Sequence, residues 1–220
     1  MLNFKCIDPP NFGMLQTELP EVAIEVLYEL ISNSVQNCSD DYEFENNKII
    51  KLGKKHQFLL NDQNKIFENL ILKPAVEKYI ETWGIPASVK TTHWHDLEFN
   101  RFWCRITKPD HYQSLHDHNG LLSFIIWLKV PTDWQEEQII NGEQNFEHPE
   151  ASDVIFTYTN ILGQIKKINF KLDKTTEGNM VMFPSDINHM VLPYFQTDDY
   201  RISVAGDISI ASNRATEEKV

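Results

Sequence analysis

Apolar residues recur at helical spacing in the first part of the chain. Between Pro20 and Val35 they are Val22, Ile24, Val26, Leu27, Leu30 and Ile31. This spacing predicts a helix with one apolar side, and Pro20 suits its first turn because a proline there loses no helical hydrogen bond. A second helical segment is expected over 62–83, where Pro74 predicts two helices or one kinked helix. The polar run 37–53 predicts a surface connection.

Beyond Val89 the pattern changes to short runs rich in β-branched and aromatic residues. Residues 167–172 and 201–204 alternate apolar with polar side chains, which is the period of a half-buried strand. Asn119-Gly120 is a typical turn between two such runs. We therefore predict an α+β fold, a double-stranded β-helix (a cupin-like jelly roll) with the N-terminal helices packed outside it.

The length of 220 residues suits one domain of this kind. We expect residues 1–220 to form a single domain, with a mainly helical part over 1–88 and the jelly-roll barrel over 89–210. A hydrophobic fraction of 41% is sufficient to bury one core and excludes a wholly disordered chain.

The net charge bears on which partners the protein can bind, and the cysteine content bears on its cellular compartment. The net charge of −12 would repel a phosphate backbone, so broad nucleic-acid binding is not expected. Cys6, Cys38 and Cys104 are odd in number and widely spaced, which favours a reducing compartment. The sequence shows neither a signal peptide nor an apolar run of about 18 residues, so we expect a cytoplasmic protein without a membrane span.

A pair of histidines gives the first sign of chemistry. His116 and His118 stand just before an apolar strand, and residues i and i+2 of an extended chain point to the same face. Both imidazoles can then reach one metal ion, while Asp117 points away. Such pairs more often lie on surfaces or in hydrogen-bond networks, so a metal site needs further support.

Residues 183–203 supply that support. A strand ends at Phe183-Pro184, and His189 begins the next strand after a short turn. Arg201 and Ser203 follow on one face of a later strand. In this order they predict a third metal ligand followed by an anion-binding pair. A guanidinium forms paired hydrogen bonds with a carboxylate, and a nearby hydroxyl can donate a third.

The order His-x-His, then FPS-x-x-x-H, then R-x-S resembles the Fe(II)- and 2-oxoglutarate-dependent oxygenases. It is most similar to the prolyl-hydroxylase-like oxygenases of bacteria and tailed phages, and the resemblance runs from Asn100 to Ser209. It implies a double-stranded β-helix in which His116 and His189 bind iron. Arg201, helped by Ser203, would bind the distal carboxylate of 2-oxoglutarate.

The third ligand departs from the usual pattern of the superfamily. Most members carry Asp or Glu at the position of His118, which gives a triad of two histidines and one carboxylate. Because the pleat of a strand should turn Asp117 away from the metal, we expect His118 to be the third ligand. Asp117 is the alternative. A neutral third ligand leaves more positive charge at the iron.

The resemblance implies a non-haem Fe(II)- and 2-oxoglutarate-dependent dioxygenase. Such a hydroxylase would use O2, release succinate and CO2, and act on a peptidyl proline, another protein side chain or a small molecule. A phage-encoded enzyme would work in the host cytoplasm. One rival is a cupin-like isomerase or dioxygenase that does not use 2-oxoglutarate, and another is a non-catalytic jelly-roll binding protein. Arg201 with Ser203 favours the oxygenase, because a cupin-like site has no use for a carboxylate clamp.

Other residues could line the substrate or cosubstrate pocket. Trp103, Tyr112 and Trp127 are candidates, although large aromatic side chains are most simply explained as core. His93 and His95 form a second His-x-His pair, but the carboxylate that a cupin motif requires does not follow at the right spacing. We expect these two histidines to be structural or to line the mouth of the site.

Overall fold

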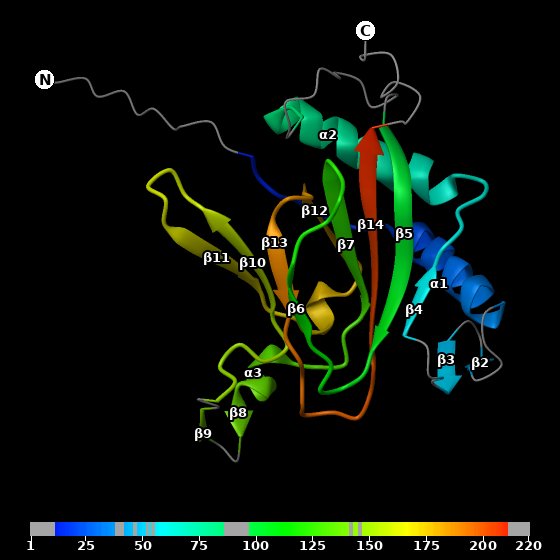
Figure 1. Cartoon of the computed structure of the whole chain (residues 1–220). Coiled ribbons are helices and arrows are strands. Elements are labelled where there is room, and N and C mark those ends of the chain that lie inside the picture. Colours follow the sequence, from blue (N-terminus) through cyan, green and yellow to red (C-terminus); the bar gives the residue numbers. More distant parts are fainter. Residues whose placement is uncertain are drawn as a thin grey trace, which may run out of the picture.

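Two antiparallel β-sheets that pack face to face form the centre of the fold (Figure 1). This computed structural model describes residues 12–37, 42–45, 48–51, 53, 56–85, 97–140, 143–144 and 147–210. In order across the larger sheet, the strands are β1 (Leu15–Glu18), β12 (Asn179–Pro184), β7 (Leu122–Lys129), β14 (Arg201–Ile210), β5 (Leu97–Thr107) and β4 (Gln57–Leu59). In order across the smaller sheet, they are β11 (Ile165–Phe170), β10 (Val154–Thr159), β13 (Asn188–Val191) and β6 (Gln113–His116).

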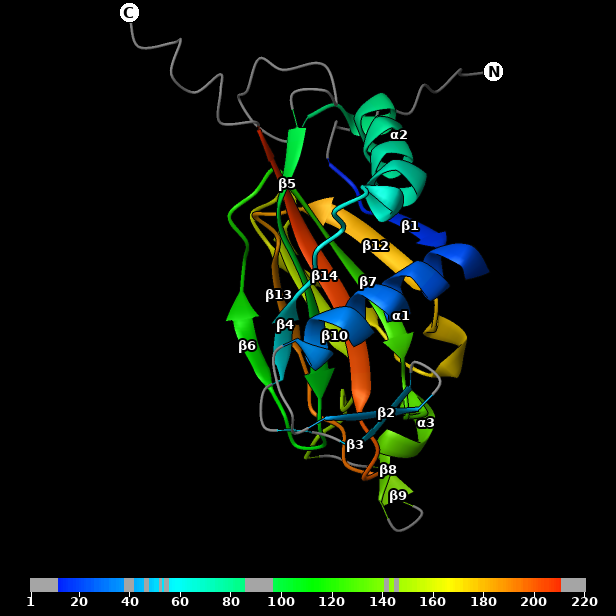
Figure 2. The ribbon, with the colours of Figure 1, turned by 90° about the vertical axis from the view of Figure 1, so that its right-hand side faces the viewer.

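Two helical segments cover the outer face of the larger sheet (Figure 2). The first is α1 (Glu21–Gln36), whose buried residues Ala23, Leu27 and Ile31 follow helical spacing. The second consists of a π-helical turn, η1 (Glu68–Leu72), that continues directly into α2 (Lys73–Trp83). The π-helical turn ends two residues before Pro74, whose ring has no N–H to continue the regular bonding pattern.

Successive side chains of β14 point alternately toward the helices and toward the smaller sheet. Ile202, Val204 and Ile208 are buried in the cluster that contains the helices. Successive side chains of a strand point to opposite faces, so Arg201 and Asp207 lie on the other face, toward the smaller sheet. A second cluster fills this interior, and it includes Trp127, Val154, Phe156, Val181, Phe183 and Val191.

Short elements complete the described part of the chain. They are the hairpin β2 (Glu43–Glu45) and β3 (Lys48–Lys51), α3 (Trp134–Glu137), the hairpin β8 (Ile139–Ile140) and β9 (Glu143–Gln144), and the 3-10 turn η3 (Lys174–Thr176). Within the described residues, no helix has the length and apolarity that crossing a membrane requires. Cys104 is buried, whereas Cys6 and Cys38 lie outside the described residues.

The predicted fold class is confirmed: two facing sheets of jelly-roll topology carry helices on the outside. The sheets face each other without closing into a continuous barrel. The helix predicted from Pro20 is confirmed as α1. The surface connection predicted over 37–53 contains the hairpin β2–β3. The N-terminal part also supplies β1 and β4 to the edges of the larger sheet, strands too short for their alternation to be recognised.

Candidate metal centre

Three histidines come together where β6 and β13 pair. His116 is the last residue of β6 and stands opposite His189 in the register of the two strands. His118 follows two residues later. One ring nitrogen from each residue lies within 4.8 Å of the others, a spacing that can hold a metal ion. Asp117 is exposed and does not belong to this group.

The backbone orients two of these imidazoles. Nδ1 of His116 lies 2.6 Å from the carbonyl oxygen of Ser114, and Nδ1 of His189 lies 3.2 Å from that of Ile187. A carbonyl oxygen only accepts hydrogen bonds, so each Nδ1 carries the proton. Each Nε2 therefore keeps the lone pair that a metal ion needs.

His118 is oriented by a carboxylate that the sequence analysis did not identify. Its Nδ1 lies 2.6 Å from Oδ1 of Asp207, which is 1% exposed. The same oxygen accepts a hydrogen bond of 2.8 Å from Ser123, whose hydroxyl also lies 2.7 Å from that of Ser185. Asp207 could have been noticed because it stands six residues after Arg201, an even spacing that places both on one face of a strand.

Burial keeps His189 neutral. The side chain is 5% exposed, and loss of hydration lowers its pKa to about 4. The neighbouring His116 and His118 act in the same direction, against the hydrogen bond to Ile187. At neutral pH the imidazole is therefore in the form that binds a metal ion.

Arg201 lies buried at the first position of β14. Its Nη2 donates to the hydroxyl oxygen of Ser152 at 2.7 Å and to its carbonyl oxygen at 3.3 Å. The guanidinium lies 4.8 Å from the centre of the Tyr194 ring. Burial lowers its pKa to about 10, so it stays protonated at neutral pH. Its Nε and Nη1 are buried and find no hydrogen-bond partner in the described part of the chain.

A cavity of about 720 Å³ opens beside the histidines. Its wall includes Gln57, Trp103, Arg105, Gln113, His116 and His118. The Trp103 ring stacks on His118, with ring centres 5.6 Å apart and planes at 25°. His116 and His118 are therefore accessible from this cavity, and Trp103 covers one side of His118.

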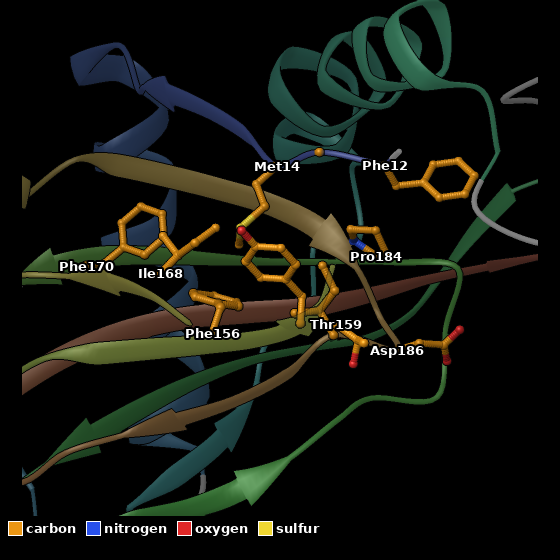
Figure 3. Close-up of a pocket in the computed structure, with 11 residues that line it drawn as sticks. Phe12, Met14, Phe156, Thr159, Ile168, Phe170, Pro184 and Asp186 are labelled. Carbon is orange, nitrogen blue, oxygen red and sulfur yellow. The ribbon is translucent and has the colours of Figure 1, made fainter. Parts of the chain in front are cut away.

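A second cavity of about 720 Å³ has a largely apolar wall (Figure 3). Met14, Phe156, Ile168 and Phe170 belong to this wall. The cavity adjoins the metal centre through Phe156, whose ring stacks on His189 with the centres 5.3 Å apart. None of the three histidines is part of its wall.

Comparison with known proteins links this geometry to a family. Residues 101–207 match a family model described as "Putative 2OG-Fe(II) oxygenase", where 2OG denotes 2-oxoglutarate. This segment contains all three histidines and Arg201. Over these residues the chain matches the 2OG-Fe(II) oxygenase superfamily, and this segment belongs to it. Fe(II) and 2-oxoglutarate are the cofactor and cosubstrate that this membership implies. No curated protein sequence matches the chain.

Solved structures resemble the fold of this chain. AviO1 from Streptomyces viridochromogenes Tue57 aligns with a TM-score of 0.50 at 10% identity, over 91% of this chain and 90% of that protein. The α-ketoglutarate-dependent carbocyclase SnoK of nogalamycin biosynthesis aligns with a TM-score of 0.50 at 12% identity, over 89% and 79%. A Pseudomonas putida prolyl-4-hydroxylase aligns with a TM-score of 0.48 at 13% identity, over 91% and 94%. At these identities the first two comparisons establish the fold alone.

The residues of this site are suited to both Fe(II) and 2-oxoglutarate. Three imidazoles with free Nε2 atoms form a donor set suited to Fe(II). The unused donors of the buried Arg201 suit an anion such as a carboxylate of 2-oxoglutarate. Without an anion these donors would be buried at a cost of roughly 1–3 kcal/mol each.

The remaining candidates from the sequence lie in different surroundings. Ser203 is half-buried on β14, in register with Trp127 on β7. Trp127 is 1% exposed and packs between the sheets near Phe170, with ring centres 5.7 Å apart. Tyr112 is 54% exposed and is not part of the cavity wall beside the histidines. Trp103 alone of the three aromatic candidates contacts the histidine group; His93 and His95 lie outside the described residues.

Proposed function

We propose that this oxygenase hydroxylates a C–H bond of its substrate, with Fe(II) bound by His116, His118 and His189. The distal carboxylate of 2-oxoglutarate is bound by Arg201, with Ser203 as a helper. The observation that carries this proposal is a three-imidazole group in the same interior as a buried arginine with unused donors. A cupin-like enzyme that does not use 2-oxoglutarate would have no need for that arginine.

The histidines are prepared for a metal ion by their partners. Their Nδ1 atoms are bonded to Ser114, Ile187 and Asp207, so the three Nε2 atoms can bind Fe(II) without further rearrangement of the rings. Fe(II) and 2-oxoglutarate supply, when bound, the activation of O2 that protein side chains cannot provide.

Arg201 binds and orients the cosubstrate. Ser152 and the ring of Tyr194 fix the guanidinium, so little side-chain freedom is lost when a carboxylate binds to its unused donors. Ser203 lies two residues along the same face, where its hydroxyl can donate one further hydrogen bond to the carboxylate.

The substrate enters through the cavity that contains His116 and His118. Gln57, Arg105 and Gln113 give this cavity a polar wall, which suits a small polar molecule or a polar segment of a polypeptide. Trp103 limits access of water to His118. The apolar cavity of Figure 3 is a less suitable entrance, because Phe156 separates it from His189.

Production of succinate tests this proposal. In air, the Fe(II)-loaded protein should convert 2-oxoglutarate to succinate, and His118→Ala should abolish both this reaction and stoichiometric Fe(II) binding. Asp117→Ala is the matched control, because Asp117 is the exposed neighbour and should keep both properties. Loss of Fe(II) binding in Asp117→Ala but not in His118→Ala would move the third ligand to the carboxylate. Absence of succinate from the iron-loaded wild-type protein would contradict the proposed function.

A further inference from the structure

Three neutral imidazoles give a metal ion no negative charge. A metal site built of two histidines and one carboxylate places one negative charge directly on Fe(II). In this chain the only described group with metal-binding spacing consists of histidines. A source of negative charge close to that group would therefore change how strongly Fe(II) binds.

Asp207 has the required position. It is 1% exposed, and its Oδ1 lies 2.6 Å from Nδ1 of His118. His118 is also the single ion-pair partner found for this carboxylate in the described residues. Burying a carboxylate beside a neutral imidazole is costly unless something compensates for the charge. A divalent cation on the other nitrogen of His118 would provide that compensation.

The surroundings of Asp207 hold the carboxylate in place. Ser123, fully buried on β7, donates to Oδ1 at 2.8 Å, and its hydroxyl is linked to that of Ser185 at 2.7 Å. The turn after His118 packs directly on this group. A Cβ atom at Gly120 would lie 2.8 Å from the Ser185 hydroxyl and 3.4 Å from Cβ of Asp207. Glycine at 120 therefore permits the close approach of the turn.

We propose that Asp207 is a positioning residue that orients His118 and strengthens it as a metal ligand. The carboxylate accepts a hydrogen bond from Nδ1–H, turns Nε2 toward the metal and makes the ring a stronger donor. Asp207 thus supplies, through the His118 ring, the negative charge that a carboxylate bound directly to the metal would supply. This inference rests on the proposed metal site.

Fe(II) binding by Asp207→Asn tests the inference. The substitution keeps the size of the side chain and removes its charge, and anaerobic titration should show Fe(II) affinity reduced by about 10- to 100-fold. The visible band of the Fe(II)–2-oxoglutarate complex should also move to shorter wavelength, because a less negative ligand set holds the iron electron more tightly. A purely structural role would not move this band. Asp186→Asn is the charge-matched control, since Asp186 is exposed in the turn before His189 and bonds to none of the histidines.

A double substitution tests whether Asp207 acts through His118 or only stabilises the fold. His118→Asp places a carboxylate on the metal, so adding Asp207→Asn in that background should leave Fe(II) affinity unchanged or increase it. An equal loss of affinity in both backgrounds would overturn the inference, as would unaltered affinity and band position in Asp207→Asn alone. Failure of the wild-type protein to bind Fe(II) would instead refute the metal site itself.

Discussion

The face of β14 that is turned toward the smaller sheet carries Arg201 at one end and Asp207 near the other. The two charged side chains differ in their hydrogen-bond partners. Arg201 has hydrogen bonds to Ser152 but retains two buried donors without a partner. Asp207 is bonded through Oδ1 to His118 and Ser123, while its Oδ2 is buried without a hydrogen-bond partner in the described residues. This difference supports the two proposals, that Arg201 binds an anion from outside and that Asp207 acts on His118.

The two ends should be separable by experiment. Six residues of extended chain place the two Cα atoms about 20 Å apart, and substitutions at that distance usually have independent effects. Substitutions at Arg201 should therefore weaken the binding of 2-oxoglutarate and leave Fe(II) affinity unchanged. Substitutions at Asp207 should mainly weaken the binding of Fe(II).

Removing Arg201 has the largest expected effect on the cosubstrate. Losing a charge-assisted contact with a carboxylate costs roughly 2–5 kcal/mol, so Arg201→Ala should raise the dissociation constant of 2-oxoglutarate at least about tenfold. Calorimetric titration of the Fe(II) protein under anaerobic conditions measures this change. Fe(II) affinity should stay the same, and a parallel loss of both affinities would show that the two ends of β14 are coupled.

Ser203→Ala should produce a smaller change of the same kind. The hydroxyl contributes about one hydrogen bond, worth roughly 0.5–1.5 kcal/mol, so the dissociation constant of 2-oxoglutarate should rise by about 2- to 12-fold. The same titration measures it, and Ser209→Ala on the same strand serves as the control. A loss as large as that of Arg201→Ala would contradict the helper role and mean that Ser203 contributes as much as the arginine.

The sequence identified the candidate ligand side chains better than the residues that support them. His116, His118, His189 and Arg201 could be found because strand periodicity and local spacing place them on particular faces. The partnership of His118 with Asp207 spans 89 positions and depends on the register of β14 with β7. Such a contact follows from tertiary pairing and cannot be derived from local pattern.

The same reason explains the other residues that the sequence analysis missed. Ser152 contacts Arg201 across 49 positions and adopts a positive φ of 71°, which is uncommon for a residue other than glycine. The short edge strands β1 and β4 are defined by their partners in the larger sheet rather than by their own alternation. Residue pattern therefore predicted the fold class and the grouping of the three histidines, while strand register determined the supporting contacts.

The most direct test of the account is the visible spectrum of the anaerobic Fe(II) protein with 2-oxoglutarate. Chelation of Fe(II) through the keto group produces a weak charge-transfer band, so the wild-type protein should develop this band and saturate at one Fe(II) per chain. His189→Ala should show no band, because one of the three ligands is lost, whereas His111→Ala should match the wild type, since His111 is exposed and outside the ligand group. A wild-type protein that binds Fe(II) yet shows no band with 2-oxoglutarate would contradict the account and favour a cupin-like metal site.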